Sequence, residues 1–304
     1  MLPAGNAAFR GDESVKMASS VHFGKDGGVW PYEWTWMTIL LTGAEGNFGL
    51  EFRRQAGASI RAVGRDDWAT LDDALDGVKR VVHAASDLRT RAADAPASLV
   101  ASNVMLTAQL LEAARRHGVR RFVFLSSCAV YGEDMRTAEE SLCCPITING
   151  VSKLLNEKLV VEFCGRNGME FQIVRVFNTY GGLDRFSILS HLEHAVRTGS
   201  VFTLNNAGLM QRDFIHVADV AAIALRLLDF DVGHHYLNIG TGNATKISTL
   251  VDIAIRRFPQ LEIRHHQTQE SEYSRADIGK LRQFFGQEFI GVEDYMRNCF
   301  AALP

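Results

Sequence analysis

The sequence has no surplus of positive charge, no long apolar run and no ordered set of cysteines. Its 304 residues carry a formal net charge of -3 at pH 7, which gives no indication of nucleic-acid binding. No apolar run reaches the roughly 18 residues needed to span a bilayer, so a membrane protein is not predicted. The cysteines are an odd set without metal-ligand spacing, which is typical of free thiols in a reducing compartment. These absences predict a soluble cytoplasmic protein.

Residues 1–36 differ from the rest of the chain. They lack apolar periodicity and the apolar core of a signal peptide, and they end in an aromatic cluster between Trp30 and Trp36. Met37 stands directly before the first strand-like run. We therefore predict a poorly ordered N-terminal extension without a catalytic part. The alternative is that the aromatic side chains cover a hydrophobic edge or a partner surface.

A glycine-rich loop at 42–49 follows the first predicted strand with the spacing G-x-x-G-x-x-G. Such a loop lets the backbone approach a pyrophosphate and directs the amides of a helix N-terminus toward its charge. Gly43 permits the turn, Gly46 leaves room for phosphates, and Gly49 lets the following helix pack against the strand. The loop alone is a weak signal, because an ordinary strand-to-helix turn can have the same glycines.

From Met37 onward, strand-like and helix-like runs alternate. The predicted strands are 38–42, 58–63, 80–84, 121–126 and 171–176, and the long helices include 97–117 and about 151–166. Continuous apolar strands separated by helices indicate a parallel sheet that is covered on both faces. We therefore predict an α/β fold, with a Rossmann-type doubly wound parallel sheet at 37–180 to which a segment at about 213–240 returns. Residues 181–304 are predicted to form mainly a smaller C-terminal α/β substrate-binding cap.

Six short motifs follow in order along this pattern. They are V-H-A-A at 82–85, Asn103, L-S-S-C-A-V-Y-G at 125–132, N-G-V-S-K at 149–153, R-V-F-N-T-Y-G at 175–181 and Q-R-D-F-I-H-V-A-D-V at 211–220. Each motif alone is weak, but six in this order at fitting intervals are a strong signal. Over about residues 37–285, the chain resembles the extended short-chain dehydrogenase/reductase family, specifically its NAD-dependent, nucleotide-sugar epimerases, dehydratases and reductases.

The resemblance assigns the catalytic centre to Ser127, Asn149 and Lys153. In that family the residue matching Ser127 hydrogen-bonds the reacting sugar oxygen, and the residue matching Lys153 binds the nicotinamide ribose. The family's catalytic tyrosine stands four residues before the lysine, where this chain has Asn149. An amide cannot exchange a proton as a phenol does, and general acid–base help is typically worth about 10²–10⁴-fold. The resemblance thus implies cofactor binding but leaves the proton transfer without its usual group.

Three explanations of Asn149 remain open at the level of sequence. Another group could supply the proton, and the candidates are Tyr131, Tyr180, Cys128 or a water held by Asn149. The reaction could instead be a reduction or a lyase step in which the substrate or solvent supplies the proton. The protein could also bind cofactor and ligand without turnover.

A nicotinamide dinucleotide is the cofactor that the resemblance implies. The residues expected to contact it are Gly43, Gly46, Asn47, Phe48, Gly49, Arg65, Ala84, Ala85, Asn103 and Lys153. Members that bind NAD carry an acidic residue at the end of the second strand, where this chain has Gly64 followed by Arg65. A guanidinium without a carboxylate beside it suits a 2′-phosphate, so we predict NADP(H) in slight preference to NAD(H).

A nucleotide-linked sugar is the substrate that the resemblance implies. The residues expected to bind it are Ser127, Cys128, Asn178 and Arg212. Of these, Asn178 and Arg212 match positions near the sugar diphosphate; the alternative for Arg212 is a surface ion pair with Asp213. A further arginine that the family often has near this chain's segment 276–280 is not clearly present, and Arg275 is the candidate to replace it.

No metal site is predicted. Adjacent histidines in the pairs His234-His235 and His265-His266 would point to opposite faces of a strand, and no acidic cluster joins them at ligand spacing.

The predicted function is an NAD(P)-dependent epimerase/dehydratase or ketosugar reductase that moves a hydride to or from a nucleotide-linked sugar, with atypical acid–base chemistry. The alternative is a catalytically weak or inactive NAD(P)-binding sensor or partner protein. The family usually dimerises by pairing the helices at about 97–117 and 151–166, so the resemblance also implies a homodimer.

Overall fold

The computed structural model describes residues 38–56, 59–87, 96–133, 136–233, 235–268, 273–286 and 288–303. The predictions for residues 1–36 and for His234 therefore lie outside the described residues.

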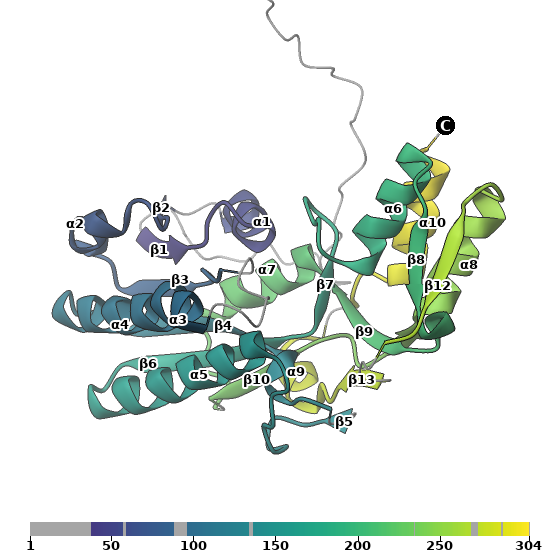
Figure 1. The fold of residues 1–304 in the computed structure, drawn as a ribbon. Coiled ribbons are helices and arrows are strands. Elements are labelled where there is room, and N and C mark those ends of the chain that lie inside the picture. The colour runs from purple at the N-terminus through teal and green to yellow at the C-terminus, as the bar shows by residue number, and fades with distance from the viewer. Residues whose placement is uncertain are drawn as a thin grey trace, which may run out of the picture. The chain divides into compact units, whose positions relative to one another are not determined.

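A six-stranded parallel sheet is the central element of these residues (Figure 1). In spatial order its strands are β10 (Tyr236–Ile239), β6 (Glu170–Val176), β4 (Arg121–Ser127), β3 (Arg80–His83), β1 (Thr38–Thr42) and β2 (Ser59–Val63). Every neighbouring pair is parallel, so the carboxyl ends of all these strands lie at the same edge. The predicted Rossmann-type sheet is thereby confirmed, and β10 returns to it from the C-terminal half of the chain.

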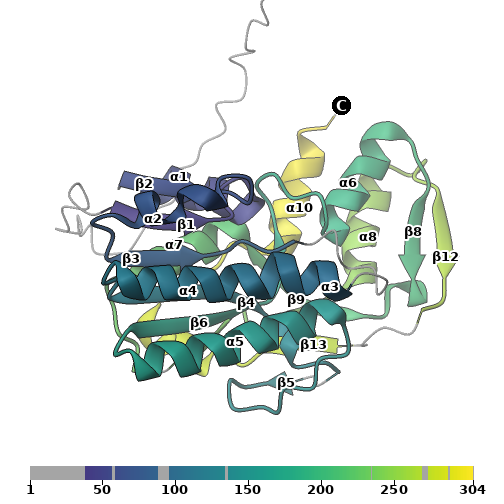
Figure 2. The same cartoon turned by 60° about the vertical axis from the view of Figure 1, so that its left-hand side comes forward.

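Alternate strand residues supply two hydrophobic clusters, one on each face of the sheet, because successive side chains of a strand point to opposite faces. Leu41 belongs to the first cluster and Leu40 to the second. The first face is covered by α1 (Asn47–Ala56) and α7 (Val217–Leu227), and the second by α2 (Leu71–Leu75), α4 (Leu106–Arg116) and α5 (Ile148–Arg166). Figure 2 shows α4 and α5 side by side across the second face, with α7 behind the sheet.

The helix predicted at 97–117 consists of three consecutive pieces. The short helix α3 (Pro96–Leu99) continues into a π-helical turn, η4 (Val100–Met105), and then into α4. By length and composition alone, residues 96–116 could cross a membrane. That criterion is weak support for a span, because buried residues such as Leu110 and Leu111 pack in the second cluster against the sheet.

The C-terminal elements gather at the end of the sheet where β6 continues into β7 (Asn178–Tyr180; Figures 1 and 2). A second sheet has the order β11 (Ala244–Lys246), β9 (Gln211–His216), β13 (Tyr273–Ala276) and β5 (Arg136–Thr137), with β7 also paired to β9. The strands β8 (Phe202–Asn205) and β12 (Ile263–His266) form a separate pair. The remaining helices are α6 (Ile188–Thr198), α8 (Ile247–Arg257), α9 (Gly279–Phe284) and α10 (Val292–Ala301). A third hydrophobic cluster lies among α6, α8, α10, β8 and β9 and includes Tyr180, Phe214 and Phe300, whereas Leu281 of α9 belongs to the first cluster. The domain division at residue 180 stays a prediction.

Candidate cofactor-binding and active site

The glycine loop joins β1 to α1 and leaves one of its sides accessible. Gly43 has a φ of 75°, and a Cβ there would lie within 3 Å of the backbone of Ala84 and Ala85. A Cβ on Gly49 would lie 2.3 Å from the carbonyl oxygen of Gly43, so this glycine lets α1 begin against the loop. A Cβ on Gly46 would meet nothing within 4 Å except that same oxygen, at 3.3 Å. The loop is therefore closed toward the protein at Gly43 and Gly49 but accessible at Gly46.

The side chains of Asn47 and Phe48 are used inside the protein. Asn47 donates from Nδ2 to the carbonyl oxygen of Gly181 (2.9 Å), and its Oδ1 accepts from the amide of Leu183 (2.7 Å). Phe48 packs on the first cluster, with its ring centroid 5.5 Å from that of Phe52. Both residues fix the glycine loop against its neighbours, and the Gly46 amide donates to the carbonyl oxygen of Gly43 at 3.1 Å, so the amides of the first turn of α1 are the candidate groups for a phosphate.

His83 joins the ends of β1 and β3 to η4 as a neutral side chain. The Thr107 hydroxyl donates to the carbonyl oxygen of Asn103 (2.7 Å), so it accepts from Nε2 of His83 (2.8 Å). Nδ1 of His83 then accepts from the Thr42 hydroxyl (2.6 Å), whose oxygen accepts from the amide of Ala85 (3.2 Å). Burial lowers the pKa of His83 to about 3. This histidine therefore links the carboxyl ends of β1 and β3 to η4 and stays uncharged near neutral pH.

Arg65 has a carboxylate beside it, which the sequence prediction did not foresee. Its Nη1 lies 3.0 Å from Oδ2 of Asp87, whose side chain is only 8% exposed. The amide of Asp87 donates to Oδ1 of Asn103 at 2.7 Å. The loop after β3 brings Asp87 to the loop after β2, and the preference for NADP(H) stays a prediction. Arg65 would have to share or leave this ion pair in order to bind a 2′-phosphate.

Several buried polar atoms near the carboxyl ends of β3 and β4 have no hydrogen-bond partner among the described residues. They are Ser86 Oγ, Asn103 Nδ2, Asn149 Oδ1 and Asn156 Oδ1, which we call the open set. Nε of Arg121, at the opposite end of β4, shares this property. Burying an unsatisfied polar group costs about 1–3 kcal/mol, so native proteins rarely leave such groups together without a ligand or water to satisfy them.

Ser127 ends β4 and caps the short 3-10 helix η5 (Cys128–Val130). Its Oγ accepts from the amide of Ala129 at 3.2 Å, and its hydroxyl also acts on the neighbouring Cys128 thiol through a side-chain hydrogen bond. Burial raises the pKa of the neighbouring Cys128 thiol to about 11, although the charge of Arg212 acts in the opposite direction. A thiol with that pKa is a poor proton donor and a poor nucleophile at neutral pH.

The start of α5 is pressed against η5, which brings Asn149 and Lys153 to the end of β4. Thr147 caps the helix by accepting from the amide of Gly150 at 3.1 Å. A Cβ on Gly150 would lie 2.4 Å from the carbonyl oxygen of Ala129, so only glycine allows this approach. Asn149 and Lys153 are four residues apart on one helix and therefore lie on the same face.

Lys153 is a buried amine with one hydrogen-bond acceptor among the described residues. Its Nζ donates to the carbonyl oxygen of Leu125 at 2.8 Å and lies 5.1 Å from the centre of the Phe124 ring. Only 7% of the residue is exposed. Burial lowers the pKa of Lys153 to about 8, and the nearby carboxylate of Glu157 offsets this only in part.

A second group of buried polar residues, which we call the paired network, lies on the far side of β4. Its members are Ser126, Tyr131, Glu157, Arg175 and Asn238. Arg175 donates to both oxygens of Glu157 (3.0 and 2.8 Å) and to the hydroxyl oxygen of Tyr131 (3.1 Å). Ser126 donates to Glu157 at 2.5 Å, and Tyr131 donates to Oδ1 of Asn238 at 2.6 Å. Burial raises the pKa of Tyr131, so its phenol stays protonated.

The hydroxyls of both tyrosines considered as replacements for the missing phenol therefore already donate hydrogen bonds within the protein. The hydroxyl of Tyr131 is held in the paired network, and that of Tyr180 donates to the carbonyl oxygen of Ile290 at 2.5 Å. Tyr180 is fully buried, and burial raises its pKa as well. The geometry removes both from the list of proton donors at Ser127.

The predicted substrate residues Asn178 and Arg212 meet at β9. Asn178 donates to the carbonyl oxygen of Asp213 at 2.9 Å, and Arg212 donates from Nη1 to that of Gln211 at 3.0 Å. The Asp213 carboxylate accepts from Thr241, Gly242 and Ala276 and so holds the loop after β10. Its role is structural.

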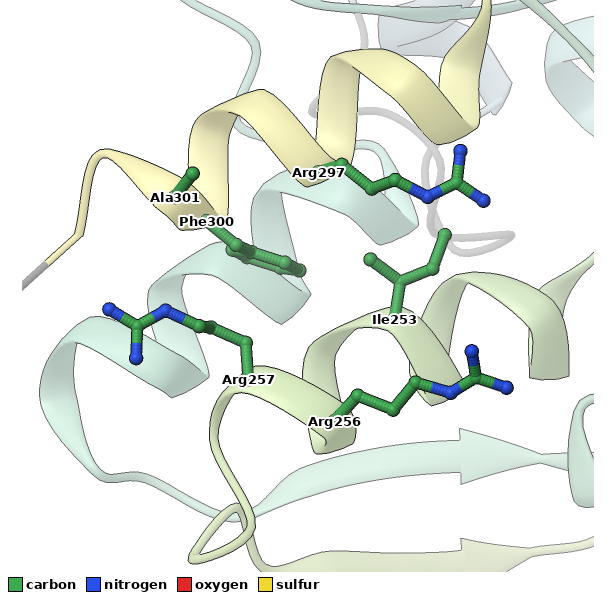
Figure 3. A pocket seen from close by; sticks show the side chains of 6 residues that line it. All are labelled: Ile253, Arg256, Arg257, Arg297, Phe300 and Ala301. Atoms are coloured by element: carbon green, nitrogen blue, oxygen red, sulfur yellow. The ribbon is translucent and has the colours of Figure 1, made fainter.

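A pocket of about 310 Å³ lies away from this edge, between α8 and α10 (Figure 3). It is lined by Ile253, Arg256, Arg257, Arg297, Phe300 and Ala301. Arg297 is paired with Glu293 and Asp294, and Arg257 donates to the carbonyl oxygen of Leu303. The pocket offers no acid, base or nucleophile. Within the described ranges, no group of three or more His, Cys, Asp or Glu side chains could hold a metal ion.

The parallel sheet and the glycine loop at its carboxyl edge define a Rossmann-type α/β protein, and comparison with known proteins names its family. The chain belongs to the NAD dependent epimerase/dehydratase family, whose sequence profile matches residues 39–240.

Known proteins with related sequences are similar over most of the chain. The uncharacterized UDP-glucose epimerase YtcB of Bacillus subtilis is 28% identical over 77% of this chain and 77% of its own. A putative UDP-glucose 4-epimerase of Methanocaldococcus jannaschii is 29% identical over 70% of each chain. Among solved structures, MoeE5 in complex with UDP-glucose and NAD is 26% identical with a TM-score of 0.76, covering 87% of this chain and 97% of that one.

Sequence reasoning missed Ser86 and Asn156 of the open set. Ser86 directly follows the quoted V-H-A-A motif at a strand end, where ligands of parallel sheets bind, so its position was a usable signal. Asn156 lies three residues after Lys153 and donates to the carbonyl oxygen of Asn103 at 3.2 Å. A polar residue at helical spacing from the motif lysine was the available signal.

Proposed function

We propose that the protein is an NAD(P)-dependent epimerase/dehydratase or ketosugar reductase that transfers hydride to or from a carbon of a nucleotide-linked sugar. The observation that carries the proposal is the open set beside a glycine loop that is accessible at Gly46. Family membership and the NAD and UDP-glucose bound by MoeE5 support the same reading.

The residues present fit a nicotinamide dinucleotide. Gly46 gives a phosphate access to the first amides of α1, a ten-residue helix. The unpartnered Ser86 Oγ and Asn103 Nδ2 offer hydrogen bonds further along the same edge. Lys153 is the residue proposed to hold the nicotinamide ribose. When bound, the cofactor supplies the hydride chemistry.

The nucleotide preference rests on Arg65. Its charge favours NADP(H), as the sequence predicts, but its ion pair with Asp87 reduces that advantage. We therefore propose that the protein accepts both NAD(H) and NADP(H), with any preference for NADP(H) small.

Ser127 and Arg212 are the proposed contacts of the sugar substrate. The Ser127 hydroxyl lies at the end of β4, where a sugar oxygen would accept its proton in place of the Cys128 thiol. Arg212 lies close enough to Cys128 to influence the pKa of that thiol, so its guanidinium charge is near the same strand end. Asn178 is held at β9 and supports this wall. A diphosphate near Arg212 would place the sugar toward Ser127.

A second candidate function is a nicotinamide-binding sensor with little turnover. It is favoured by Asn149 and by the occupied hydroxyls of Tyr131 and Tyr180. The two candidates make different predictions for hydride transfer but not for cofactor binding.

The first experiment is to denature the purified protein and determine by mass spectrometry which nucleotide is released. The native protein is then mixed with NAD or NADP and with UDP-glucose, dTDP-glucose and related sugars while the absorbance of reduced nicotinamide is followed. Bound dinucleotide with hydride transfer supports the enzyme. Bound dinucleotide without hydride transfer across the panel favours the sensor, and a protein that binds neither nucleotide contradicts both.

We also propose a cytoplasmic homodimer. Val100, Met105, Val151 and Leu155 are exposed apolar side chains on η4 and α5, the elements that the resemblance pairs between subunits. All five cysteines are free, which supports a reducing compartment. Sedimentation equilibrium measures the association directly, and a monomer at micromolar concentration would contradict it.

A further inference from the structure

We propose that Lys153 is the general base that replaces the missing phenol, and that Asn149 is a positioning residue that holds the bridging water between the sugar hydroxyl and the Lys153 amine. The proposal rests on the proposed function, because it names the group that takes the proton during hydride transfer. It adds a role that the resemblance does not assign to either residue.

The other ionisable groups described around the end of β4 are held in hydrogen bonds or kept protonated by burial. Tyr131 belongs to the paired network, and Glu157 is bound at both oxygens by Arg175. His83 uses both ring nitrogens, one to Thr42 and one to Thr107. The Cys128 thiol is held protonated by burial. Lys153 is the remaining side chain there that can gain and lose a proton near neutral pH.

The placement of Lys153 and Asn149 also supports the proposal. The Lys153 ammonium has three donors, and one is directed to the carbonyl oxygen of Leu125. Asn149 lies one helical turn earlier on the same face of α5, and its Oδ1 is buried without a partner. An acceptor of this kind can bind a water that also meets the amine. Ser127, two residues after Leu125 on β4, places the reacting oxygen at this strand end.

The proposal is supported as well by the electrostatic surroundings of the Lys153 amine. It faces the Phe124 ring from β4, the neutral His83 from β3 and, on its own helix, Glu157, whose charge is paired with Arg175 of β6. No unpaired carboxylate among these groups fixes the positive charge. Burial brings the pKa of Lys153 to about 8, well below the ordinary 10.5, so a useful fraction is the free amine at neutral pH.

The proton and electrons balance in this scheme. As the sugar is oxidised, its O–H bond breaks and the proton passes through the water to the free amine of Lys153, which becomes an ammonium. The C–H bond breaks with its electron pair, and the hydride goes to the nicotinamide dinucleotide, which is reduced. The sugar C–O bond becomes a carbonyl. In the reverse direction, the ammonium of Lys153 returns the proton.

The test combines variants with a direct titration. Lys153→Arg keeps the charge but cannot deprotonate, because arginine has a pKa above about 12. We expect it to bind NAD within about threefold of wild type and to transfer hydride from UDP-glucose about 10²–10⁴-fold more slowly in single turnover. The exposed Lys158→Arg, on the same helix, is the matched control and should transfer at the wild-type rate.

The role of Asn149 is tested through the pH profile. The wild-type oxidation rate should rise with pH and level off above about 8. Asn149→Ala should lower the plateau without moving this inflection, since the base is unchanged. An inflection that disappears or moves by more than a pH unit in this variant would contradict the division of roles.

A readout that does not depend on activity is the NMR titration of Lys153 in protein labelled at lysine. A transition near pH 8 supports the proposal, and one above pH 10 overturns it. Hydride transfer that survives in Lys153→Arg would overturn this inference and leave the proposed function standing. Absence of hydride transfer in the wild type, with NAD bound, would remove the proposed function and this inference together.

Discussion

The paired network and the open set flank the same strand and the same helix, yet their hydrogen bonding is opposite. In the paired network, Arg175, Glu157 and Tyr131 satisfy one another, and Glu157 is fully buried. In the open set, buried atoms such as Asn103 Nδ2 and Asn149 Oδ1 meet no hydrogen-bond partner in the part of the chain that the structure describes. A satisfied buried network adds rigidity, whereas unsatisfied groups are retained where a ligand completes them. The paired network therefore supports the fold around the site, and the open set is the part of the site that a ligand would contact.

The largest expected change in stability comes from a substitution that breaks the paired network. Arg175→Met would leave the Glu157 carboxylate buried without its cation, which typically costs about 3–5 kcal/mol of unfolding free energy. Urea denaturation measures this loss. The control is Arg197→Met, which removes an exposed helical pair with Glu193 and should cost less than about 1 kcal/mol. Equal losses in the two variants would mean that the network does not stabilise the fold.

Replacing glycine by alanine at two positions of the glycine loop should affect stability at one position and NAD binding at the other. Gly49→Ala puts a Cβ 2.3 Å from a backbone oxygen and should lower stability by about 1–3 kcal/mol. Gly46→Ala meets no such contact, so its stability should change by less than about 1 kcal/mol while the affinity for NAD falls at least about tenfold. Calorimetric titration and urea denaturation measure the two quantities.

The control for the glycine series is Gly165→Ala. This glycine lies within α5 with nothing near its missing Cβ, so alanine should stabilise the helix by about 0.5–1 kcal/mol. If Gly46→Ala binds NAD like the wild type, the phosphates do not lie at this loop.

Asp219 is an intermediate case, a buried carboxylate with one donor from the protein backbone, the amide of Ile290. Burial raises its pKa to about 6, above the ordinary 3.8. The stability that the protonated carboxyl contributes is therefore complete below about pH 4, and it is lost as the pH rises through about 6. Asp219→Asn keeps the acceptor without the charge, so it should be about 1–3 kcal/mol more stable than wild type at pH 7.5 and equally stable at pH 4.

Denaturation at these two pH values checks the Asp219 prediction, with the exposed Asp252→Asn as a control that should show no pH-dependent gain. A gain for Asp219→Asn that is the same at both pH values would show that the charge is not the cause.

The smallest expected effect concerns nucleotide choice. Arg65 is 43% exposed and already paired with Asp87, so its contact with a 2′-phosphate should be modest. Arg65→Ala should lower the affinity for NADP by about three- to tenfold and leave the affinity for NAD within about twofold. Competitive binding of the two nucleotides measures the ratio. An equal change in both affinities would place Arg65 away from the ribose.

Local sequence patterns predicted the sheet and the glycine loop because both depend on residues close together in the chain. The runs that became β1, β3, β4 and β6 alternate with helices, and the loop spacing identified Gly43, Gly46 and Gly49. Contacts between distant segments were not predictable in this way. Asp87 pairs with Arg65 because two loops meet at one edge, and the hydroxyl of Tyr131 is held by Arg175 of β6 and by Asn238, which returns on β10.

The most direct test removes one serine hydroxyl from the open set and, in a second variant, one from the paired network. Ser86→Ala removes an unpartnered hydroxyl of the open set, and Ser126→Ala removes a hydroxyl that donates to Glu157 in the paired network. The account predicts that Ser86→Ala unfolds like the wild type but binds NAD about tenfold more weakly. It predicts that Ser126→Ala loses about 1–3 kcal/mol of stability and binds NAD within about twofold. Unchanged NAD affinity in Ser86→Ala, or the same pair of changes in both variants, would contradict the assignment of the open set to the ligand.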